Sequence, residues 1–282
     1  MKRALSSSLL FLLLALPVGA QPPLVPAVVQ PSLQPILAPQ QAIDQSPAIV
    51  PLGSAVDPAT GKVVEGIAFI HYKKAPGHKP QHGANGGTAP TCYAHLAKGA
   101  RWKVTEQYIL DPANADGLAA ADVATWTDAG LEAWDAEVTF DAFGTRNLLG
   151  VVDGADTAAP DNKNEILFGG ISDPGVIAVT IVWGIFRGPA SGRELVEFDM
   201  TFDDPDFVWG NAGPTNEIAL GDISMIDYWN VFTHEAGHAA GMGHPSDACA
   251  AETEYRFSQE GETKKRTLSP LGDIPGIQAL YP

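Results

Sequence analysis

Five residues within one twelve-residue stretch have the types and the spacing of a metal-binding site. The stretch 233–244 reads THEAGHAAGMGH, and its chemically informative residues are His234, Glu235, His238, Gly241 and His244. Residues four apart project from the same face of a helix, so His234 and His238 can offer imidazole nitrogens to one ion. Glycine adopts positive φ without steric cost, so Gly241 can end the helix and let His244 supply a third ligand.

A site with three imidazole ligands favours catalysis over a purely structural purpose. Three protein ligands and one open position are typical of catalytic zinc, whereas structural zinc sites are closed by four ligands and are rich in cysteine. Glu235 can reach a water molecule at the open position, where a general base must lie. We therefore predict a Zn2+ site at His234, His238 and His244 with Glu235 as the catalytic base. The alternative is a chance match, which is common for H-E-x-x-H alone and rare once the glycine and the third histidine are present.

The helix that carries these residues is predicted from its apolar pattern. A mostly apolar stripe recurs at spacings of three and four on the side away from the histidines, and it consists of Ile226, Trp229, Thr233, Ala236 and Ala240. Asp222 is the expected N-cap, because its carboxylate can accept a free backbone N–H, and Gly241 is the expected end. One face of this helix should pack while the other lines a cleft.

The motif resembles that of the metzincin metalloproteases, and flanking stretches narrow the likeness to secreted prokaryotic matrixins. The stretch 272–281, GDIPGIQALY, is similar to the closing helix of matrixins. The stretch 196–202, followed by Trp209, resembles the strand and loop before their active-site helix, and 261–266 lies where prokaryotic members carry a similar run. The likeness spans about residues 92–282, which is the length of one domain.

This resemblance implies a fold, an activity and a substrate class. The expected fold is α+β, with a mixed twisted sheet, a long helix, an active-site helix and a short C-terminal helix. The expected activity is that of a secreted zinc-dependent endopeptidase, monomeric, acting on a protein or peptide substrate. Two alternatives remain: a catalytically impaired zinc-binding relative that acts as a binding protein, and a zinc hydrolase that acts on a small molecule.

One position departs from the family pattern. Metzincins place a methionine in a tight turn below the metal ligands, and the matching triplet here, residues 253–255, carries Glu254 in its place. A buried carboxylate is costly unless it is paired or protonated. Glu254 could instead accept a hydrogen bond from a ligand histidine and so orient its ring.

In metzincins an edge strand above the cleft runs antiparallel to the bound substrate, which extends the sheet by main-chain hydrogen bonds. The apolar run 176–185 is the candidate for that strand. The other interpretation of the same run is a buried core strand.

The ends and the composition of the chain point to export. Lys2 and Arg3 precede an apolar run at 9–18 and small residues at 18–20, which predicts a signal peptide at residues 1–20. The apolar run is shorter than the roughly 20 residues that a spanning helix needs, so no membrane association is expected and the location is extracellular or periplasmic. The net charge of −16 makes nucleic acid an improbable partner.

Acidic residues and cysteines give two further expectations. Asp203, Asp204 and Asp206 form the best candidate for Ca2+, although a solvated turn explains the same residues more simply. Cys92 and Cys249 are expected to form a disulfide in an exported chain. The alternative is that the Cys92 thiolate occupies the open metal position and keeps the protein latent.

The composition of the N-terminal part predicts a Pro/Gly-rich prosegment or linker over residues 21–90, with a possible short strand at 62–72. His71, His78 and His82 have irregular spacing and lysine neighbours, so a flexible connector, open to proteolytic maturation, is favoured over a metal site there. The domain at 91–282 is expected to contain a helix at 118–134 and several strands, at 102–110, 165–168, 176–186 and 194–202.

Overall fold

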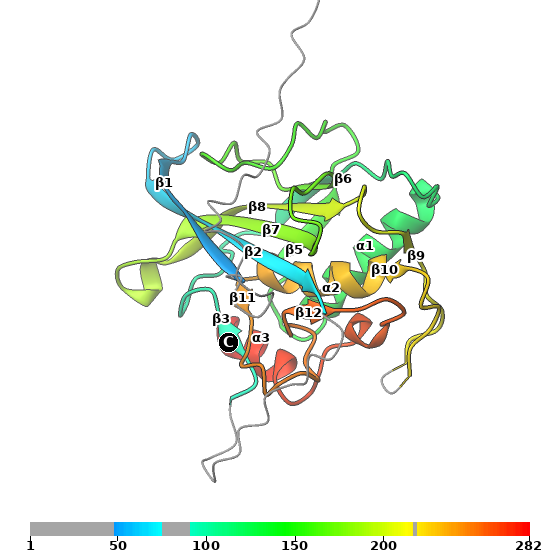
Figure 1. Ribbon diagram of the computed structural model, residues 1–282. Helices are drawn as coiled ribbons and strands as arrows, with labels where there is room; N and C mark the ends of the chain where they lie inside the picture. The colour runs from blue at the N-terminus through cyan, green and yellow to red at the C-terminus, as the bar shows by residue number, and fades with distance from the viewer. Residues whose placement is uncertain (1–47, 75–90, 217–218) are drawn as a thin grey trace, which may run out of the picture. The chain divides into compact units, whose positions relative to one another are not determined.

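The computed structural model describes residues 48–74, 91–216 and 219–282, and these form an α+β fold built on one mixed sheet (Figure 1). The strands of this sheet are β1 (Ile49–Val56), β2 (Val63–Lys73), β4 (Glu106–Leu110), β5 (Phe143–Arg146), β6 (Glu165–Gly169), β7 (Val176–Ile185), β8 (Glu194–Asp203) and β12 (Phe257–Ser258). The α-helices of the described residues are α1 (Ala120–Asp135), α2 (Tyr228–Ala239) and α3 (Asp273–Leu280). Two small two-stranded pairs join β9 (Trp209–Gly210) to β10 (Ile226–Asp227) and β3 (Ala94–His95) to β11 (Met242–Gly243).

The strand order is β1-β2-β7-β8-β6-β4-β5, and β12 pairs with the end of β2. The pairs β8-β6, β6-β4 and β4-β5 are parallel, whereas β1-β2, β2-β7 and β7-β8 are antiparallel. One face of the sheet packs against α1 and α2. On the opposite face, residues of β1, β2 and β7 pack with Ile171 and with Tyr255 and Phe257 from the segment around β12. The mixed sheet with a long helix, a motif-bearing helix and a short closing helix agrees with the expected α+β class.

The expectation of an exposed edge strand at 176–185 is wrong. Strand β7 covers this run, and it is paired on both sides, with β8 and with β2. Nine of its ten residues are buried, as its continuous apolar run allows, because a strand covered on both faces needs no polar alternation. The position beside β7 is taken by β2, the strand predicted at 62–72.

Helix α2 begins later than expected, and Asp222 is not its cap. The side chain of Asp227 accepts a hydrogen bond from the backbone N–H of Asn230 at 2.8 Å, and this caps the helix. The reason is tertiary, since Ile226 and Asp227 form the short strand β10 beside β9 and cannot be helical. Gly241, at φ +100°, follows the end of α2 as the sequence predicts.

The strand expected at 102–110 is shorter than predicted, and only Glu106–Leu110 is a strand. The backbone N–H of Trp102 donates to the Tyr281 hydroxyl, and its indole N–H donates to the carbonyl of Ala239 at the end of α2. Trp102 is therefore held by the last two helices, while the carbonyl of the preceding Arg101 accepts a hydrogen bond from the backbone N–H of Leu195 in β8 at 3.1 Å. Strand β1, which forms a hairpin with β2, was not predicted.

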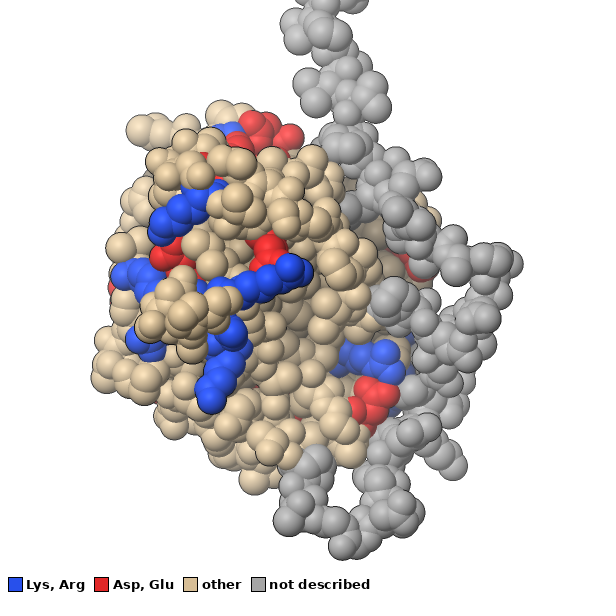
Figure 2. All heavy atoms as spheres, turned by 90° about the vertical axis from the view of Figure 1, so that its left-hand side faces the viewer, with Lys and Arg blue, Asp and Glu red and all other residues tan. Residues whose placement is uncertain are grey.

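Charge is unevenly distributed over the molecule. The face in Figure 2 carries more Lys and Arg than Asp and Glu, although the chain as a whole is strongly acidic. Acidic side chains instead gather around β8 and the loop before β6. Among the residues that the structure describes, no helix is both long and apolar enough to cross a membrane.

Candidate metal centre

Three histidine rings converge on one point beside α2. The Nε2 atoms of His238 and His244 lie 3.0 Å apart, and those of His244 and His234 lie 3.3 Å apart. Helix α2 supplies His234 and His238 from one face, and the turn at Gly241 brings His244 back against them. These three residues are the metal ligands that the sequence predicts, and their ligand atoms form a group able to hold an ion.

Backbone carbonyls orient two of the rings. Nδ1 of His234 donates to the carbonyl of Thr253 at 2.6 Å, and Nδ1 of His238 donates to the carbonyl of Met242 at 3.2 Å. A carbonyl can only accept, so each Nδ1 carries the proton and each Nε2 presents a lone pair to the shared point.

The site fits a tetrahedral metal ion. Two nitrogens bound to one tetrahedral zinc lie about 3.3 Å apart, which follows from Zn–N distances of about 2.0–2.1 Å. Burial lowers the pKa of His238 to about 4 and those of His234 and His244 well below their usual value. The rings are therefore held neutral, as metal ligands must be. The residues present can accommodate a metal ion, and three imidazoles suit zinc among other transition metals.

Glu235 lies next to the histidines and is fully buried. Its Oε1 accepts a hydrogen bond from Nδ1 of His71 at 2.9 Å, and its Oε2 accepts one from the Thr180 hydroxyl at 2.6 Å. Burial raises the pKa of Glu235 to about 7. A carboxyl group with this pKa can take up and release a proton near neutral pH, as a general base must.

Strand β2 covers the three histidines. Phe69 stacks on His238 with ring centroids 4.0 Å apart and planes 9° apart, and the ring of His71 lies 3.9 Å from that of His234. Phe69 also contacts His244 edge-on. The sequence placed His71 at the end of the strand predicted at 62–72 and disfavoured a metal-binding role for it, whereas the structure brings it to the centre of the site. His78 and His82 lie outside the described residues.

Lys265 closes the far side of the His71 ring. Nε2 of His71 accepts a hydrogen bond from the Ser258 hydroxyl at 3.0 Å, and Nζ of Lys265 lies 3.3 Å from the same atom. Burial lowers the pKa of Lys265 to about 8. The resemblance marked the run 261–266 without assigning functional residues in it, so Lys265, Thr180 and His71 are site residues that sequence analysis missed. The alternation within 62–72 was the one available signal, since it puts Phe69 and His71 on the same face.

The remainder of the run 261–266 holds the start of α2. The guanidinium of Arg266 forms an ion pair with Asp227, the N-cap of α2, and Nε donates to Oδ1 at 2.9 Å. The backbone N–H of Lys265 donates to the side chain of Asn230 at 2.8 Å. The run is therefore attached to the helix that carries the ligands.

Glu254 is buried directly beneath α2, at the position where the resemblance expects methionine. Its Oε2 lies 3.0 Å from Nδ1 of His238, but this N–H points to the Met242 carbonyl. Within the described part of the chain, neither carboxylate oxygen of Glu254 has a hydrogen-bond partner. Burial raises the pKa of Glu254 well above its usual range, so the protonated form is favoured. Gly237 makes room for this side chain, because a Cβ there would lie 2.0 Å from Oε1 of Glu254.

The residues considered for calcium lie where β8 ends. Asp203 is buried, Asp204 and Asp206 follow it, and burial raises the pKa of Asp203 to about 7. Asp204 accepts hydrogen bonds from the backbone N–H of Ala115 at 3.0 Å. Calcium binding by these three residues stays a prediction. A second acidic group, not predicted, consists of Asp156, Asp161 and Glu197.

Cys92 and Cys249 are joined in a disulfide with their Cα atoms 5.4 Å apart. A bonded cysteine has no thiolate to offer, so the alternative in which Cys92 holds the metal does not describe this structure. The bridge ties the start of β3 to the loop that follows His244.

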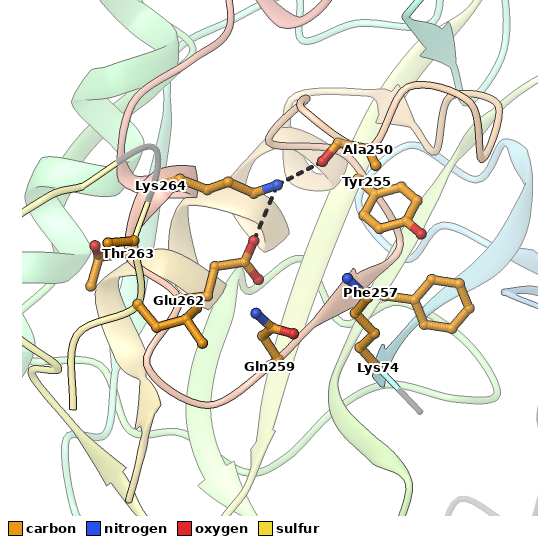
Figure 3. Close-up of a pocket in the computed structure, with 10 residues that line it drawn as sticks. Lys74, Ala250, Tyr255, Phe257, Gln259, Glu262, Thr263 and Lys264 are labelled. Carbon is orange, nitrogen blue, oxygen red and sulfur yellow. Dashed lines mark hydrogen bonds and ion pairs between the residues drawn. The ribbon is translucent and has the colours of Figure 1, made fainter. Parts of the chain in front are cut away.

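An open pocket of about 270 Å³ lies beside the end of β2 (Figure 3). Tyr255 and Phe257 line it together with Lys264, whose Nζ donates to the carbonyl of Ala250 at 2.6 Å. The three histidines and Glu235 are not among its lining residues. The metal centre is therefore separate from this pocket, and β2 lies over the metal centre.

The fold and the site together define an α+β protein with a buried three-histidine candidate metal centre. No model of a known protein family matches the chain, and no curated protein matches it.

Proposed function

We propose that this protein is a secreted zinc-dependent endopeptidase of the metzincin type, similar to matrixins. The observation that carries the proposal is the convergence of three Nε2 atoms within 3.0–3.3 Å, with Glu235 adjacent on the same helix. Export is supported by the predicted signal peptide at residues 1–20 and by the disulfide between Cys92 and Cys249.

The ligand residues and Glu235 divide the work between them. His234, His238 and His244 would hold the ion, which when bound supplies Lewis-acid activation of water and of a peptide carbonyl group. Glu235 is placed to accept a proton from water, hold it at its carboxylate, and return it to the leaving amine. Its pKa of about 7 suits both transfers.

A second function is favoured by two observations. Glu254 is buried beneath the ligands, and the hydrogen bonds of His71 and Thr180 occupy both oxygens of Glu235. A zinc-binding relative without hydrolytic activity, acting as a binding protein, would be compatible with that arrangement.

Replacing Glu235 with Ala tests the peptidase proposal. The variant should keep its metal, because Glu235 is not a ligand, and should lose activity by about 10²- to 10⁴-fold. Replacing His238 with Ala should instead remove the metal. Metal content would be measured by mass spectrometry and cleavage with a peptide library. Unchanged cleavage by the Glu235→Ala variant would contradict the assignment of the base, and a metal-loaded protein that cleaves no peptide under any condition would favour the binding protein.

A further inference from the structure

Strand β2 makes the closest contacts to the reactive groups of the proposed site. Its residues Phe69 and His71, two positions apart on one face, lie against the ligand rings, and His71 binds the proposed base. The two oxygens of Glu235 are both engaged, one by β2 and one by β7. A substrate group that approaches Oε1 of Glu235 from the side of β2 must therefore displace His71.

The path of β2 has the form of a groove that binds an extended peptide. On one side β2 pairs antiparallel with β7, in a register that sets His71 opposite Ala178. On the other side it pairs antiparallel with β1 over residues 63–69 and parallel with β12 only at Tyr72 and Lys73. Just beyond, the backbone N–H of Lys74 donates to the carbonyl of Ser258 at 2.7 Å. Main-chain hydrogen bonds on both sides bind a strand of almost any sequence, and side-chain pockets then supply selectivity.

His71 fills such a pocket. The strand register is irregular between His71 and Tyr72, and irregularities of this kind change the direction of a side chain. The imidazole is fully buried, with Glu235 at one nitrogen and with Ser258 and Lys265 at the other. The Lys265 ammonium group donates to the carbonyl of Tyr255 as well as facing His71, so it offers hydrogen bonds at the end of the pocket.

We infer that the groove between β7 and β12 is the peptide-binding site of this protein and that β2 occupies it as an internal ligand. Lys265 determines which side chain enters the His71 pocket. This inference rests on the proposed function and names its substrate class. The ligand is an extended peptide whose side chain at the His71 position accepts hydrogen bonds, as those of His, Gln and Glu do. While β2 stays in the groove, it competes with every such peptide.

The groove is tested by the binding of a fluorescent synthetic peptide with the sequence of β2, VVEGIAFIHYK, to the full chain. Glu235→Gln serves as the zinc-loaded parent, so that binding is measured without cleavage. Gly66→Val weakens β2 away from the site, because a Cβ at Gly66 would lie 2.7 Å from the Trp183 ring. His71→Ala empties the pocket, and Ile70→Ala, on the opposite face of β2, is the matched control.

The peptide should bind the Gly66→Val and His71→Ala proteins at least about tenfold more tightly than the parent and the Ile70→Ala control. Circular dichroism establishes whether each variant is folded. If the Gly66→Val protein is not folded, the comparison is made with the His71→Ala protein alone. Equal binding to all four proteins, or no gain in the folded variants, would overturn the inference.

The pocket is tested in the His71→Ala protein with peptides that carry Gln, Glu or Leu in place of histidine. Gln and Glu peptides should bind about tenfold or more tightly than the Leu peptide, because the Leu peptide takes away the acceptor that His71 offered and leaves the buried ammonium group with the Tyr255 carbonyl alone. Lys265→Met should remove this difference. A preference that persists in the Lys265→Met protein would show that Lys265 does not determine it.

Peptide binding and peptide cleavage separate the two proposals. Binding that follows these patterns, with no cleavage by the Gly66→Val protein that retains Glu235, would leave the groove established and refute the peptidase. Cleavage by the wild-type chain that the β2 peptide does not inhibit would refute the groove and leave the peptidase standing.

Discussion

At the residue scale, the hydrogen bonds of the ligand histidines decide what the site can bind. Protons on Nδ1 of His234 and His238 are fixed by the carbonyls of Thr253 and Met242, so lone pairs must meet at the centre. Neutral, buried imidazole nitrogens stabilise one another little, whereas a cation bound between them stabilises the arrangement strongly. The carbonyl of Thr253 comes from the same turn that carries Glu254, and this links the turn to ligand geometry.

Glu254→Met should stabilise the protein and leave metal binding nearly unchanged. The change removes a buried carboxyl group without hydrogen bonds, so we expect the free energy of unfolding to rise by about 1–2 kcal/mol. His238 keeps its hydrogen bond to Met242, so the metal affinity should change by less than tenfold. Thermal unfolding and competition with a chelator measure the two quantities. A loss of affinity beyond tenfold would mean that the Glu254 carboxylate orients the ring.

At the element scale, contacts at its start, its middle and its end hold α2 in place. Its start is capped by Asp227 and attached to Arg266, its end turns at Gly241, and its middle packs closely on α1 and on Glu254. Close approach is possible because Gly130 and Gly237 carry no side chain; a Cβ at Gly130 would lie 2.5 Å from the ring of Phe232.

Gly237→Ala is expected to destabilise the fold. The added methyl group would lie 2.5 Å from the Trp134 ring as well as against Glu254, and overpacking of a core typically costs 1–3 kcal/mol. Gly192→Ala, where nothing lies within 4 Å, is the matched control and should leave the unfolding temperature unchanged. Equal unfolding temperatures for the two variants would show that α2 moves freely away from this contact.

Strand β8 makes stability depend on pH through Glu197. Burial and the nearby charges of Asp156 and Asp161 raise the pKa of Glu197 to about 8, from an ordinary value of 4.5. Between these two values the folded protein binds a proton that the unfolded chain has released, so stability falls as pH rises. The contribution is fully present below pH 4.5 and is lost as pH passes 8.

The unfolding free energy should therefore decrease by on the order of 3 kcal/mol between pH 5 and pH 9, measured with chelator present to exclude cations. Glu197→Gln should reduce this dependence, because the amide resembles the protonated acid. Glu132→Gln, an exposed residue of α1, makes the same change of charge and should not reduce it. An identical pH profile for both variants would remove Glu197 as the cause.

At the scale of the whole molecule, the disulfide closes a long loop. Cys92 and Cys249 are 157 residues apart, and their bond fixes the start of β3 beside the loop after His244. Replacing both cysteines with Ala should lower the free energy of unfolding by roughly 2–5 kcal/mol, chiefly because the unfolded chain gains freedom. Thermal unfolding under oxidising and reducing conditions measures this. A protein whose unfolding temperature does not respond to reductant would contradict the prediction.

The sequence predicted the parts of this protein that depend on local spacing. The ligand set follows from residues four and six positions apart around one glycine, and α1, β6, β7 and β8 follow from the apolar pattern of each segment. Helix α3 was expected only from the resemblance of residues 272–281 to a known closing helix. The start of α2 was predicted five residues early, because the pairing of Asp227 with β9 is not visible in the local pattern.

Only the tertiary structure decided what surrounds the ligands. His71 is 164 residues from Glu235, and Lys265 is 194 residues from His71, yet the side chain of His71 contacts both of the others. Strand pairing with β7 and β12 creates this proximity, and pairing depends on backbone hydrogen bonds that nearly every sequence can form. The helix motif therefore specifies the candidate metal ligands, whereas the sheet determines which strand lies beside them.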